Sequence, residues 1–229
     1  MIAIIGDIHG CYYTLKELVD KIRTKYPAIE IYSVGDLVDR GNFSYEVFEF
    51  IISERIRFTP GNHDYMFYYF VNQPSSEMGR AWIYNGSETT VNSYNKHIGE
   101  MSRHLELIIK APLFLDLDDC FISHAGISVY YKSKLPKKII ENIDQLDKVM
   151  YSNLDSDHGI LWTRDPLLNI GKLQVVGHTR HINVAFQEKN NVVYIDTSVY
   201  SGNKLSAVVV DKNNILDIIS IPTVKKDIN

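Results

Sequence analysis

The sequence predicts an α/β protein with a largely parallel sheet and a functional site at the carboxyl ends of the strands. Three stretches of strand length, Ile2 to Ile5, Ile29 to Val34 and Arg55 to Thr59, are each followed by a polar loop and a helical pattern. After residue 112 the chain turns to short strands separated by Asn- and Gly-rich turns. We find no linker, low-complexity run or internal repeat, and therefore predict one domain over residues 1–229.

The loop that follows each of these strands is rich in glycine and acidic residues. The first strand runs into Gly6 to Gly10, and apolar residues at helical spacing then predict an amphipathic helix over residues 12–25. The second strand runs into Gly35 to Gly41, and another helical period follows over residues 47–52. The third strand runs into Pro60 to Asp64. This repeated alternation favours parallel strands whose tips share one edge of the sheet.

Residues of about 72–110 interrupt the alternation with Trp82, several tyrosines, a polar turn and further predicted helices. We interpret this segment as a cap-like insert in which substrate could be selected. The later strands are predicted at residues 113–117, 120–123, 173–176, 184–187, 192–195, 205–210 and 215–221. The lysine-rich stretch from Lys132 to Lys138 is expected to be an exposed loop that leads into a helix.

The composition is that of an ordinary globular protein, with 45% apolar and 23% charged residues. A net charge of −4 gives no electrostatic footprint of a nucleic-acid-binding protein. Two cysteines are too few for a disulfide framework. No apolar run approaches the roughly 20 residues needed to span a bilayer, and no basic segment precedes the first strand. We therefore expect a cytoplasmic protein without a membrane partner.

Five polar loops, each directly after a predicted strand, hold the side chains that could perform chemistry. They supply Asp7, His9, Asp36, Asp39, Arg40, Asn62, His63, His124 and His178. Because Asp7 and His9 stand two positions apart on an extended segment, their side chains point the same way and can reach one cation. Carboxylate, imidazole and amide oxygen suit a divalent metal such as manganese, iron or zinc. Two divalent cations carry more positive charge than the carboxylates of Asp7 and Asp36 neutralise. The excess positive charge could lower the pKa of a bound water and bind an anionic phosphate.

Each of these loops has a simpler explanation when it is considered alone. Asp and Gly are common turn residues, and a single histidine is more often a core or turn residue than a metal ligand. The five loops in combination favour the metal-ligand interpretation. The remaining histidines match no motif and are expected at the surface; they are His97, His104, His158 and His181.

The motifs GDIHG, GDLVDRG, GNHD, HAG and GHT, in this order, resemble those of the calcineurin-like metallophosphoesterases, in their phosphoprotein phosphatase branch. Their spacing, together with Trp82…Asn85-Gly86 and Trp162-Thr163-Arg164, is similar to that of bacterial and phage-lambda-type serine/threonine protein phosphatases. The resemblance extends from Ile2 to about Val210. It implies a four-layer α/β/β/α metallophosphoesterase sandwich with two mixed sheets and the site at the carboxyl ends of the strands.

The resemblance also implies a dinuclear metal centre. The first metal would be held by Asp7, His9 and Asp36, and the second by Asp36 as a bridge together with Asn62, His124 and His178. A bridging carboxylate holds two cations about 3.5–4 Å apart, which is the separation used for in-line displacement. Two divalent ions are therefore the expected cofactors, with manganese as the first choice and iron or zinc as alternatives.

The same resemblance assigns roles to residues that do not bind metal. His63 would protonate the departing oxygen, and Asp39 would hold His63 in the required orientation. Arg40 would clamp phosphate oxygens because a planar guanidinium binds them in bidentate fashion. Arg164 would be a second clamp, and Tyr200 would line the pocket and contact the substrate.

Two details of the motifs leave the substrate open. The third motif ends in Asp64, where protein phosphatases more often have glutamate and diadenosine tetraphosphate hydrolases have aspartate, whereas Asp39 and Arg40 keep the form typical of protein phosphatases. Our first hypothesis is hydrolysis of phosphoserine and phosphothreonine in a phosphoprotein or phosphopeptide. The alternative is a symmetrical dinucleoside polyphosphate hydrolase. A catalytically silent sensor, with partners bound through residues 72–110, is a third hypothesis, against which the complete set of motif residues argues.

Overall fold

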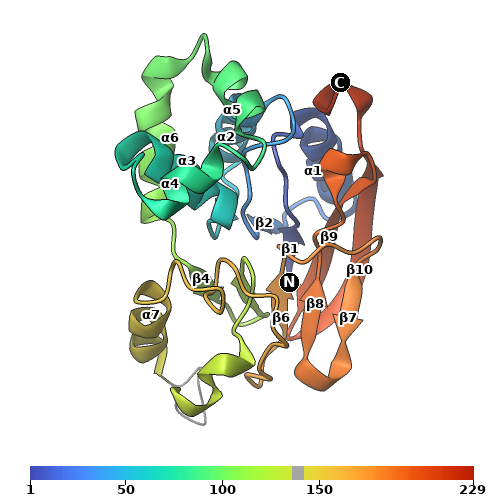
Figure 1. Ribbon diagram of the computed structural model, residues 1–229. Helices are drawn as coiled ribbons and strands as arrows, with labels where there is room; N and C mark the ends of the chain where they lie inside the picture. The colour runs from blue at the N-terminus through green and yellow to red at the C-terminus, as the bar shows by residue number, and fades with distance from the viewer. Residues whose placement is uncertain (136–141) are drawn as a thin grey trace.

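The computed structural model describes residues 1–135 and 142–229, and Figure 1 shows how their helices and strands are arranged. The second half of the loop predicted at Lys132 to Lys138 lies outside the described residues.

The strands form two five-stranded sheets. The first sheet has the order β10-β9-β1-β2-β3 and the second has the order β4-β5-β6-β8-β7. The bounds are β1 (Ile2–Ile5), β2 (Glu30–Ser33), β3 (Arg57–Phe58), β9 (Lys204–Asp211) and β10 (Asn214–Pro222) in the first sheet, and β4 (Phe114–Asp116), β5 (Phe121–Ser123), β6 (Gln174–Val176), β7 (Ala185–Gln187) and β8 (Val192–Tyr194) in the second. Strands β1, β2 and β3 are parallel, as are β5, β6 and β8. In the first sheet β9 runs antiparallel to both β1 and β10, and in the second sheet the edge strands β4 and β7 run antiparallel to their neighbours. Both sheets are therefore mixed, as the family resemblance implies.

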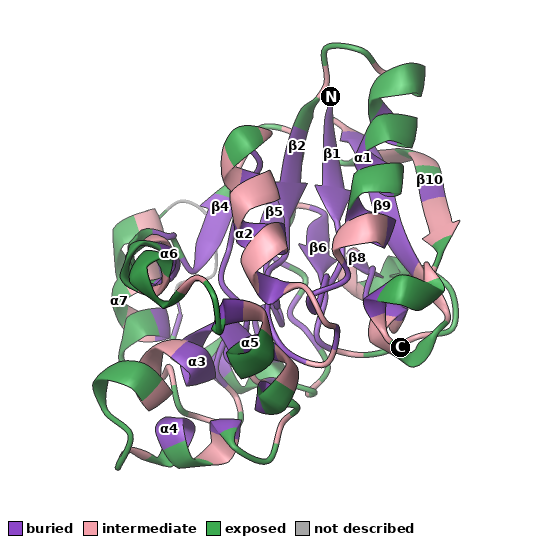
Figure 2. Cartoon of the chain, turned by 90° about the horizontal axis from the view of Figure 1, so that it is seen from above, coloured by how far each residue is buried: buried purple, intermediate pink, exposed green. Residues whose placement is uncertain are grey.

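The two sheets pack face to face through alternate residues of their strands. In β1, Ile2 and Ile4 belong to the apolar cluster shared with the second sheet, whereas Ala3 and Ile5 belong to the cluster that includes helix α1. This alternation follows from the two-residue period of a strand. Figure 2 shows the central strands of both sheets as buried and the outer faces of the helices as exposed.

Seven α-helices are present in the described ranges 1–135 and 142–229. They are α1 (Tyr12–Lys25), α2 (Ser44–Ser53), α3 (Asn62–Asn72), α4 (Glu77–Trp82), α5 (Ser87–Tyr94), α6 (Ile98–Lys110) and α7 (Ile143–Tyr151). Helix α1 contacts β9 and β10, α5 contacts α2, and α6 contacts α3. Helices α3 to α6 gather at the upper left of Figure 1. None of the helices described is both long and apolar enough to cross a membrane.

His104 corrects the expectation that the four unassigned histidines lie at the surface. Its side chain is fully buried, and its ring lies between the hydroxyl of Tyr94, 2.7 Å from Nδ1, and Glu49, 2.8 Å from Nε2. The ring also stacks on Phe48. Burial lowers the pKa of His104. The prediction was wrong because polar partners from α2 and α5 make the interior acceptable to an imidazole.

The amino end of α1 is capped by a residue from the far end of the chain. Cys11, at the N-cap position, makes no side-chain hydrogen bond that caps the helix. The carboxylate of Asp227 accepts instead from the backbone N–H groups of Tyr13 (2.9 Å) and Thr14 (2.8 Å) and from the Thr14 hydroxyl (2.6 Å). Asp227 thereby satisfies two of the free N–H groups at the helix start and complements its dipole.

Asp227→Ala is therefore expected to lower the free energy of unfolding by about 2 kcal/mol, since it removes a charged cap from a buried helix terminus. Urea denaturation followed by circular dichroism measures this loss. Lys226→Ala is the matched control, because the exposed side chain of Lys226 makes only one of the described hydrogen bonds, to the Tyr13 hydroxyl. Equal midpoints for the two variants would contradict the capping role of Asp227.

Candidate metal centre

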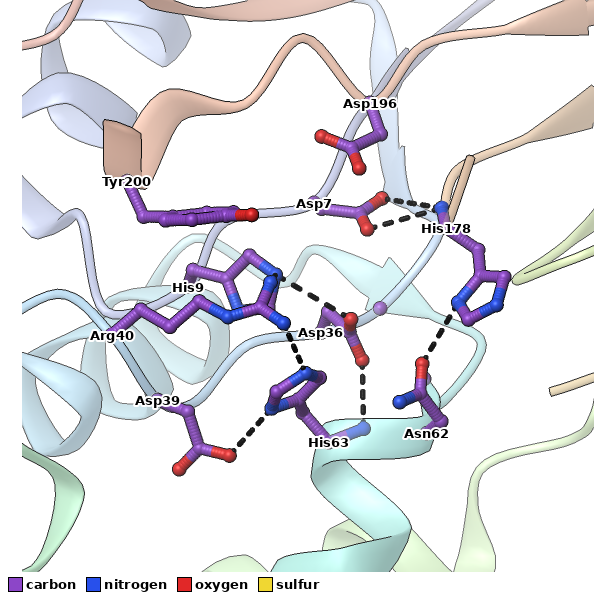
Figure 3. Close-up of polar contacts among 12 residues, drawn as sticks. Asp7, His9, Asp36, Asp39, Arg40, Asn62, His63, His178, Asp196 and Tyr200 are labelled. Carbon is purple, nitrogen blue, oxygen red and sulfur yellow. Dashed lines mark hydrogen bonds and ion pairs between the residues drawn. The ribbon is translucent and has the colours of Figure 1, made fainter. Parts of the chain in front are cut away.

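Loops at the carboxyl ends of β1, β2, β3, β5, β6 and β8 converge on one cavity of about 240 Å³. The predicted residues that line it are Asp7, Asp36, Arg40, Asn62, His63, Arg164, His178 and Tyr200. The predicted residues His9, Asp39 and His124 are fully buried next to the cavity lining. The structure thus brings together the residues that the sequence places in five separate loops (Figure 3).

Several of these residues have a backbone conformation that is rare for side chains with a Cβ. The φ angles of His9, Asp36, Asp39, Arg40 and His178 are 46°, 49°, 72°, 73° and 59°. A non-glycine residue in this left-handed region costs roughly 1–3 kcal/mol, and such strain is concentrated at functional sites. The strain supports a functional role for these loops, because the tight turns at the strand tips direct the side chains toward the cavity.

Asp36 lies between two groups of potential metal ligands. Its Oδ2 atom is 3.5 Å from Nε2 of His9 and 3.6 Å from Nε2 of His124. Ligand atoms of His9, Asp36 and His63 lie within 4.8 Å of one another, and so do those of Asp7, Asp36 and His124. Asp36 is the member common to both groups, which is the position that a bridging carboxylate requires.

Three of the residues that the resemblance assigns to the second metal, Asn62, His124 and His178, have acceptor atoms that face one another. Nδ1 of His124 donates to the carbonyl of Val34 (2.9 Å) and Nε2 of His178 donates to that of Trp162 (3.0 Å), so the other nitrogen of each ring carries a lone pair. These lone-pair nitrogens both lie 3.0 Å from Oδ1 of Asn62, which is also an acceptor. A cation satisfies three converging acceptors, and carbonyl-oriented imidazoles are typical of metal ligands. Burial lowers the pKa of His178 to about 3, which keeps its ring neutral as a ligand must be.

The carboxylates of the site repel one another. Burial, together with the charges of Asp196 and Asp36, raises the pKa of Asp7 well above its usual value. Burial alone would also raise the pKa of Asp36, but the neighbouring His124 and His63 hold it below its usual range. A divalent cation would stabilise the deprotonated form of every carboxylate in this cluster. The donor atoms and the charge of the site therefore fit a metal centre.

His63 is held by Asp39 and Arg40. Its Nδ1 atom lies 2.7 Å from Oδ2 of the buried Asp39, and its Nε2 atom lies 2.8 Å from Nη2 of Arg40. Nη1 of Arg40 lies 2.8 Å from Nε2 of His9, and the guanidinium lies 4.3 Å from the ring centre of Tyr200. The lone pair on Nε2 of His9 can bind either the Arg40 guanidinium or a metal ion, but not both. A metal bound to His9 would therefore displace Arg40 from this nitrogen.

Four residues in the cavity lining were missed by the sequence analysis as site residues: Asn85, Trp162, Arg180 and Asp196. Asp196 follows strand β8 by two positions, so the rule that polar residues at strand tips form the site would have identified it. Arg180 donates from Nη1 to the hydroxyl of Tyr200 at 2.9 Å. Asn85 belongs to the segment 72–110, which therefore reaches the cavity directly.

Gly177 leaves the space that the carboxylate of Asp7 occupies. A Cβ atom on Gly177 would overlap Asp7 Oδ1 and would also meet the side chain of Val34 at 2.7 Å. Gly177→Ala is therefore expected to displace Asp7 and to weaken manganese binding about 10–100-fold. Calorimetric titration with manganese measures the change.

Gly99→Ala is the matched control for Gly177→Ala. Nothing lies within 4 Å of a Cβ at Gly99, which stands in helix α6. Alanine there is expected to stabilise the helix and to leave manganese binding unchanged. Unchanged manganese affinity in Gly177→Ala would show that Asp7 is not a ligand.

Buried imidazoles, carboxylates and an amide oxygen meet at the tips of two mixed sheets, and this donor set places the chain in the class of proteins with a candidate divalent-metal site. The chain belongs to the calcineurin-like phosphoesterase family, whose sequence pattern matches residues 1–219. The fold predicted from the resemblance, with two mixed sheets flanked by helices, is confirmed.

The similar curated proteins include bis(5'-nucleosyl)-tetraphosphatases designated asymmetrical. That of Halalkalibacterium halodurans is 35% identical over 145 residues, which cover 54% of this chain and 56% of the relative. That of Geobacillus sp. is 33% identical, and the match covers 62% of its length. The chain thus spans little more than half of the first two relatives. That of Bacillus cereus strain Q1 is 28% identical over 246 residues, which cover 96% of this chain and 93% of the relative.

Solved structures share the fold at low sequence identity. A candidate diadenosine tetraphosphatase has a TM-score of 0.61 and 19% identity, over 97% of this chain and 93% of the other. A cold-active protein-tyrosine phosphatase of a psychrophilic Shewanella has a TM-score of 0.62 and 18% identity, over 96% and 79%. A serine/threonine phosphatase from Saccharomyces cerevisiae has a TM-score of 0.59 and 19% identity, over 97% and 80%. These matches concern the fold alone.

Proposed function

We propose that this chain hydrolyses dinucleoside polyphosphates at a dinuclear metal centre. The observation that carries the proposal is the position of Asp36, whose carboxylate is shared by two groups of buried ligand atoms. The names of the curated relatives support the alternative of the sequence analysis more than its first hypothesis of a serine/threonine protein phosphatase. Those names also specify asymmetrical cleavage, whereas the sequence analysis considered the symmetrical reaction.

The proposed first metal site consists of Asp7, His9 and Asp36, and the second of Asp36, Asn62, His124 and His178. When bound, two divalent ions would supply a nucleophilic water and neutralise charge on the phosphate. The buried imidazoles keep their lone pairs directed into the site, since backbone carbonyls hold their other nitrogens. Manganese is the first candidate, with iron and zinc as alternatives.

The chain's own residues would bind the polyphosphate and deliver a proton. Arg40, Arg164 and Arg180 line one cavity and provide guanidinium groups for several phosphate oxygens. His63 would transfer a proton from Nε2 to the departing oxygen, and Asp39 would hold Nδ1. Tyr200 orients two of the guanidinium groups, because its ring contacts Arg40 and its hydroxyl contacts Arg180.

A groove beside the catalytic cavity supports a nucleotide substrate. The cavity of about 240 Å³ is too small for a whole dinucleotide, so part of such a substrate must extend outside it. A groove of about 510 Å³ shares Arg180 with the cavity and is also lined by Ile182, Ser198 and Asn203. Ile182 is 79% exposed and offers an apolar surface to a nucleobase. The Arg180 guanidinium can bind phosphate or stack on the base.

Comparison of kcat/KM values with manganese on diadenosine tetraphosphate, a phosphoserine peptide and p-nitrophenyl phosphate tests the proposal. We expect diadenosine tetraphosphate to be the best substrate and a chelator to abolish turnover. Products separate the two modes of cleavage, since asymmetrical hydrolysis gives ATP and AMP and symmetrical hydrolysis gives two ADP. A preference for the phosphopeptide would instead support the protein phosphatase hypothesis. Inactivity on all three substrates would favour the catalytically silent sensor.

Ile182→Ala tests the groove separately from the chemistry. We expect KM for diadenosine tetraphosphate to rise about fivefold, because the lost apolar contact is worth about 1 kcal/mol. The kinetics with p-nitrophenyl phosphate should not change, since this small substrate does not reach the groove. Ile83→Ala is the matched control, because Ile83 is 55% exposed and does not line the groove. Equal KM values for the dinucleotide in both variants would contradict this use of the groove.

A further inference from the structure

The carboxylate of Asp39 is held by side chains from the segment 72–110. Asp39 is fully buried, and its Oδ2 atom accepts from Nδ1 of His63 at 2.7 Å. Nε1 of Trp82, at the end of α4, lies 3.0 Å from Oδ1 and 2.9 Å from Oδ2. The hydroxyl of Thr90, in α5, donates to Oδ1 at 2.8 Å. Two of the three side chains that hold this carboxylate therefore come from one segment distant in sequence.

The hydroxyl of Thr90 also fixes the backbone at Asp39. It lies 2.9 Å from the backbone N–H of Asp39 and 2.9 Å from the hydroxyl of Ser44. Because it donates its one proton to the Asp39 carboxylate, it accepts from these two groups. The next residue, Arg40, donates its backbone N–H to the carbonyl of Gly86 at 3.1 Å. Helix α5 and the turn before it thus hold two of the strained residues of this loop, Asp39 and Arg40.

The arrangement leaves Asp39 one favourable way to bind His63. Trp82 contacts both oxygens and Thr90 occupies Oδ1, so Oδ2 is directed to the imidazole. A carboxylate at Nδ1 selects the tautomer with a proton on that nitrogen, and Nε2 then faces the cavity. The ring of Trp82 is itself fixed by packing against Phe67 and Phe70, with ring centres 5.1 and 4.7 Å away.

We propose that Trp82 and Thr90 are positioning residues for the Asp39–His63 pair, so that the segment 72–110 controls delivery of a proton to the leaving group. The inference rests on the proposed function, in which the imidazolium of His63, with its Nδ1–H held by Asp39, leaves its contact with Arg40 and gives its Nε2 proton to the departing oxygen as the P–O bond breaks. That oxygen takes the bonding electron pair, and solvent water returns the proton to His63. Trp82 and Thr90 do not touch the substrate and act through Asp39.

The dependence on the leaving group distinguishes this role from structural support. Phenyl phosphate needs protonation of its leaving oxygen more than p-nitrophenyl phosphate does, because phenolate is the poorer leaving group. For Thr90→Val we expect kcat on phenyl phosphate to fall about tenfold, which is part of what a general acid contributes. The kcat on p-nitrophenyl phosphate should change less than about twofold, and KM should stay constant for both. Thr90→Ser, which keeps the hydroxyl, should restore kcat.

Ser93→Ala is the matched control for Thr90→Val. Ser93 also joins α5 to α2, because its hydroxyl accepts from the N–H of Tyr45 at 2.9 Å and donates to Glu46 at 3.2 Å. It makes no described contact with Asp39. This control should leave both kcat values unchanged. An equal fall in kcat on both substrates in Thr90→Val, or the same losses in Ser93→Ala, would overturn the proposal.

The ring nitrogens of His63 give a readout that does not require activity. ¹⁵N spectra of the wild-type protein should show Nδ1 protonated and Nε2 exposed to solvent exchange. Thr90→Val and Trp82→Phe should shift the population toward the other tautomer, whereas Ser93→Ala should not. If the wild-type protein cleaves neither diadenosine tetraphosphate nor the two esters, the proposed function fails, and these spectra still test whether Trp82 and Thr90 position His63. Unchanged His63 spectra in both variants would refute it.

Discussion

Asp36→Asn is expected to lower kcat for phosphate hydrolysis at least about a thousandfold, because metal stabilisation of transition-state charge is worth several kcal/mol. Asp36 is the acid shared by both groups of ligand atoms, and asparagine has no charge with which to bridge two cations. The fold should be retained, since an amide oxygen can still accept the backbone N–H of His63, as Oδ1 of Asp36 does at 2.9 Å. Steady-state kinetics with saturating manganese measures the loss.

The metal content of the same variant provides an independent measurement. We expect two manganese ions per wild-type chain and at most one per Asp36→Asn chain, by metal analysis after dialysis. Asp20→Asn is the control, because Asp20 is an exposed acid on helix α1 and makes no ion pair among those described. Two bound ions in the Asp36→Asn protein, or turnover close to wild type, would disprove the bridging role.

The resemblance predicted the fold and the composition of the candidate site because both depend on short-range patterns. Ile2 to Ile5 is apolar throughout and its strand is buried, and Asp7 and His9 follow directly at the strand tip. Parallel strands bring their tips to one edge, so local sequence is sufficient to gather loops far apart in the chain. Asp196 obeys the same rule and could have been found.

Contacts that depend on the tertiary fold could not be predicted. Asp227 caps a helix more than 200 positions earlier in the chain, and Trp82 reaches Asp39 across 43 positions. His104 was assigned to the surface because its sequence neighbours do not reveal Glu49 and Tyr94 as partners. The third strand was predicted over residues 55–59, but only Arg57–Phe58 pair with β2, because the chain turns away toward Pro60. Helix α7 was not specifically predicted.

Asp64 fixes the relative position of two loops that carry proposed metal ligands. It is fully buried, and its carboxylate accepts from the backbone N–H groups of Gly61 and Leu37, each at 2.8 Å. These bonds join the start of α3, which carries Asn62 and His63, to the loop that carries Asp36.

His63→Asn is expected to lower kcat by about 10²–10⁴-fold on substrates with poor leaving groups, which is the usual contribution of a general acid. His63 lies between the buried carboxylate of Asp39 and the guanidinium of Arg40, at 2.7 and 2.8 Å. Asparagine can keep a hydrogen bond to Asp39 but cannot transfer a proton at neutral pH. KM should change little, because Arg40 and the metals would continue to bind phosphate.

The comparison of leaving groups separates proton transfer from phosphate binding in this variant. With p-nitrophenyl phosphate the loss of kcat should be at least about tenfold smaller than with phenyl phosphate, since the better leaving group needs less acid catalysis.

His97→Asn is the matched control for His63→Asn, because His97 stacks on Tyr45 away from the cavity lining. Manganese binding should be unaltered in both variants, because His63 is not a proposed ligand. Loss of a manganese ion in His63→Asn would instead make His63 a member of the first metal site, in agreement with its place beside His9 and Asp36. Near-normal turnover of phenyl phosphate would exclude His63 as the acid.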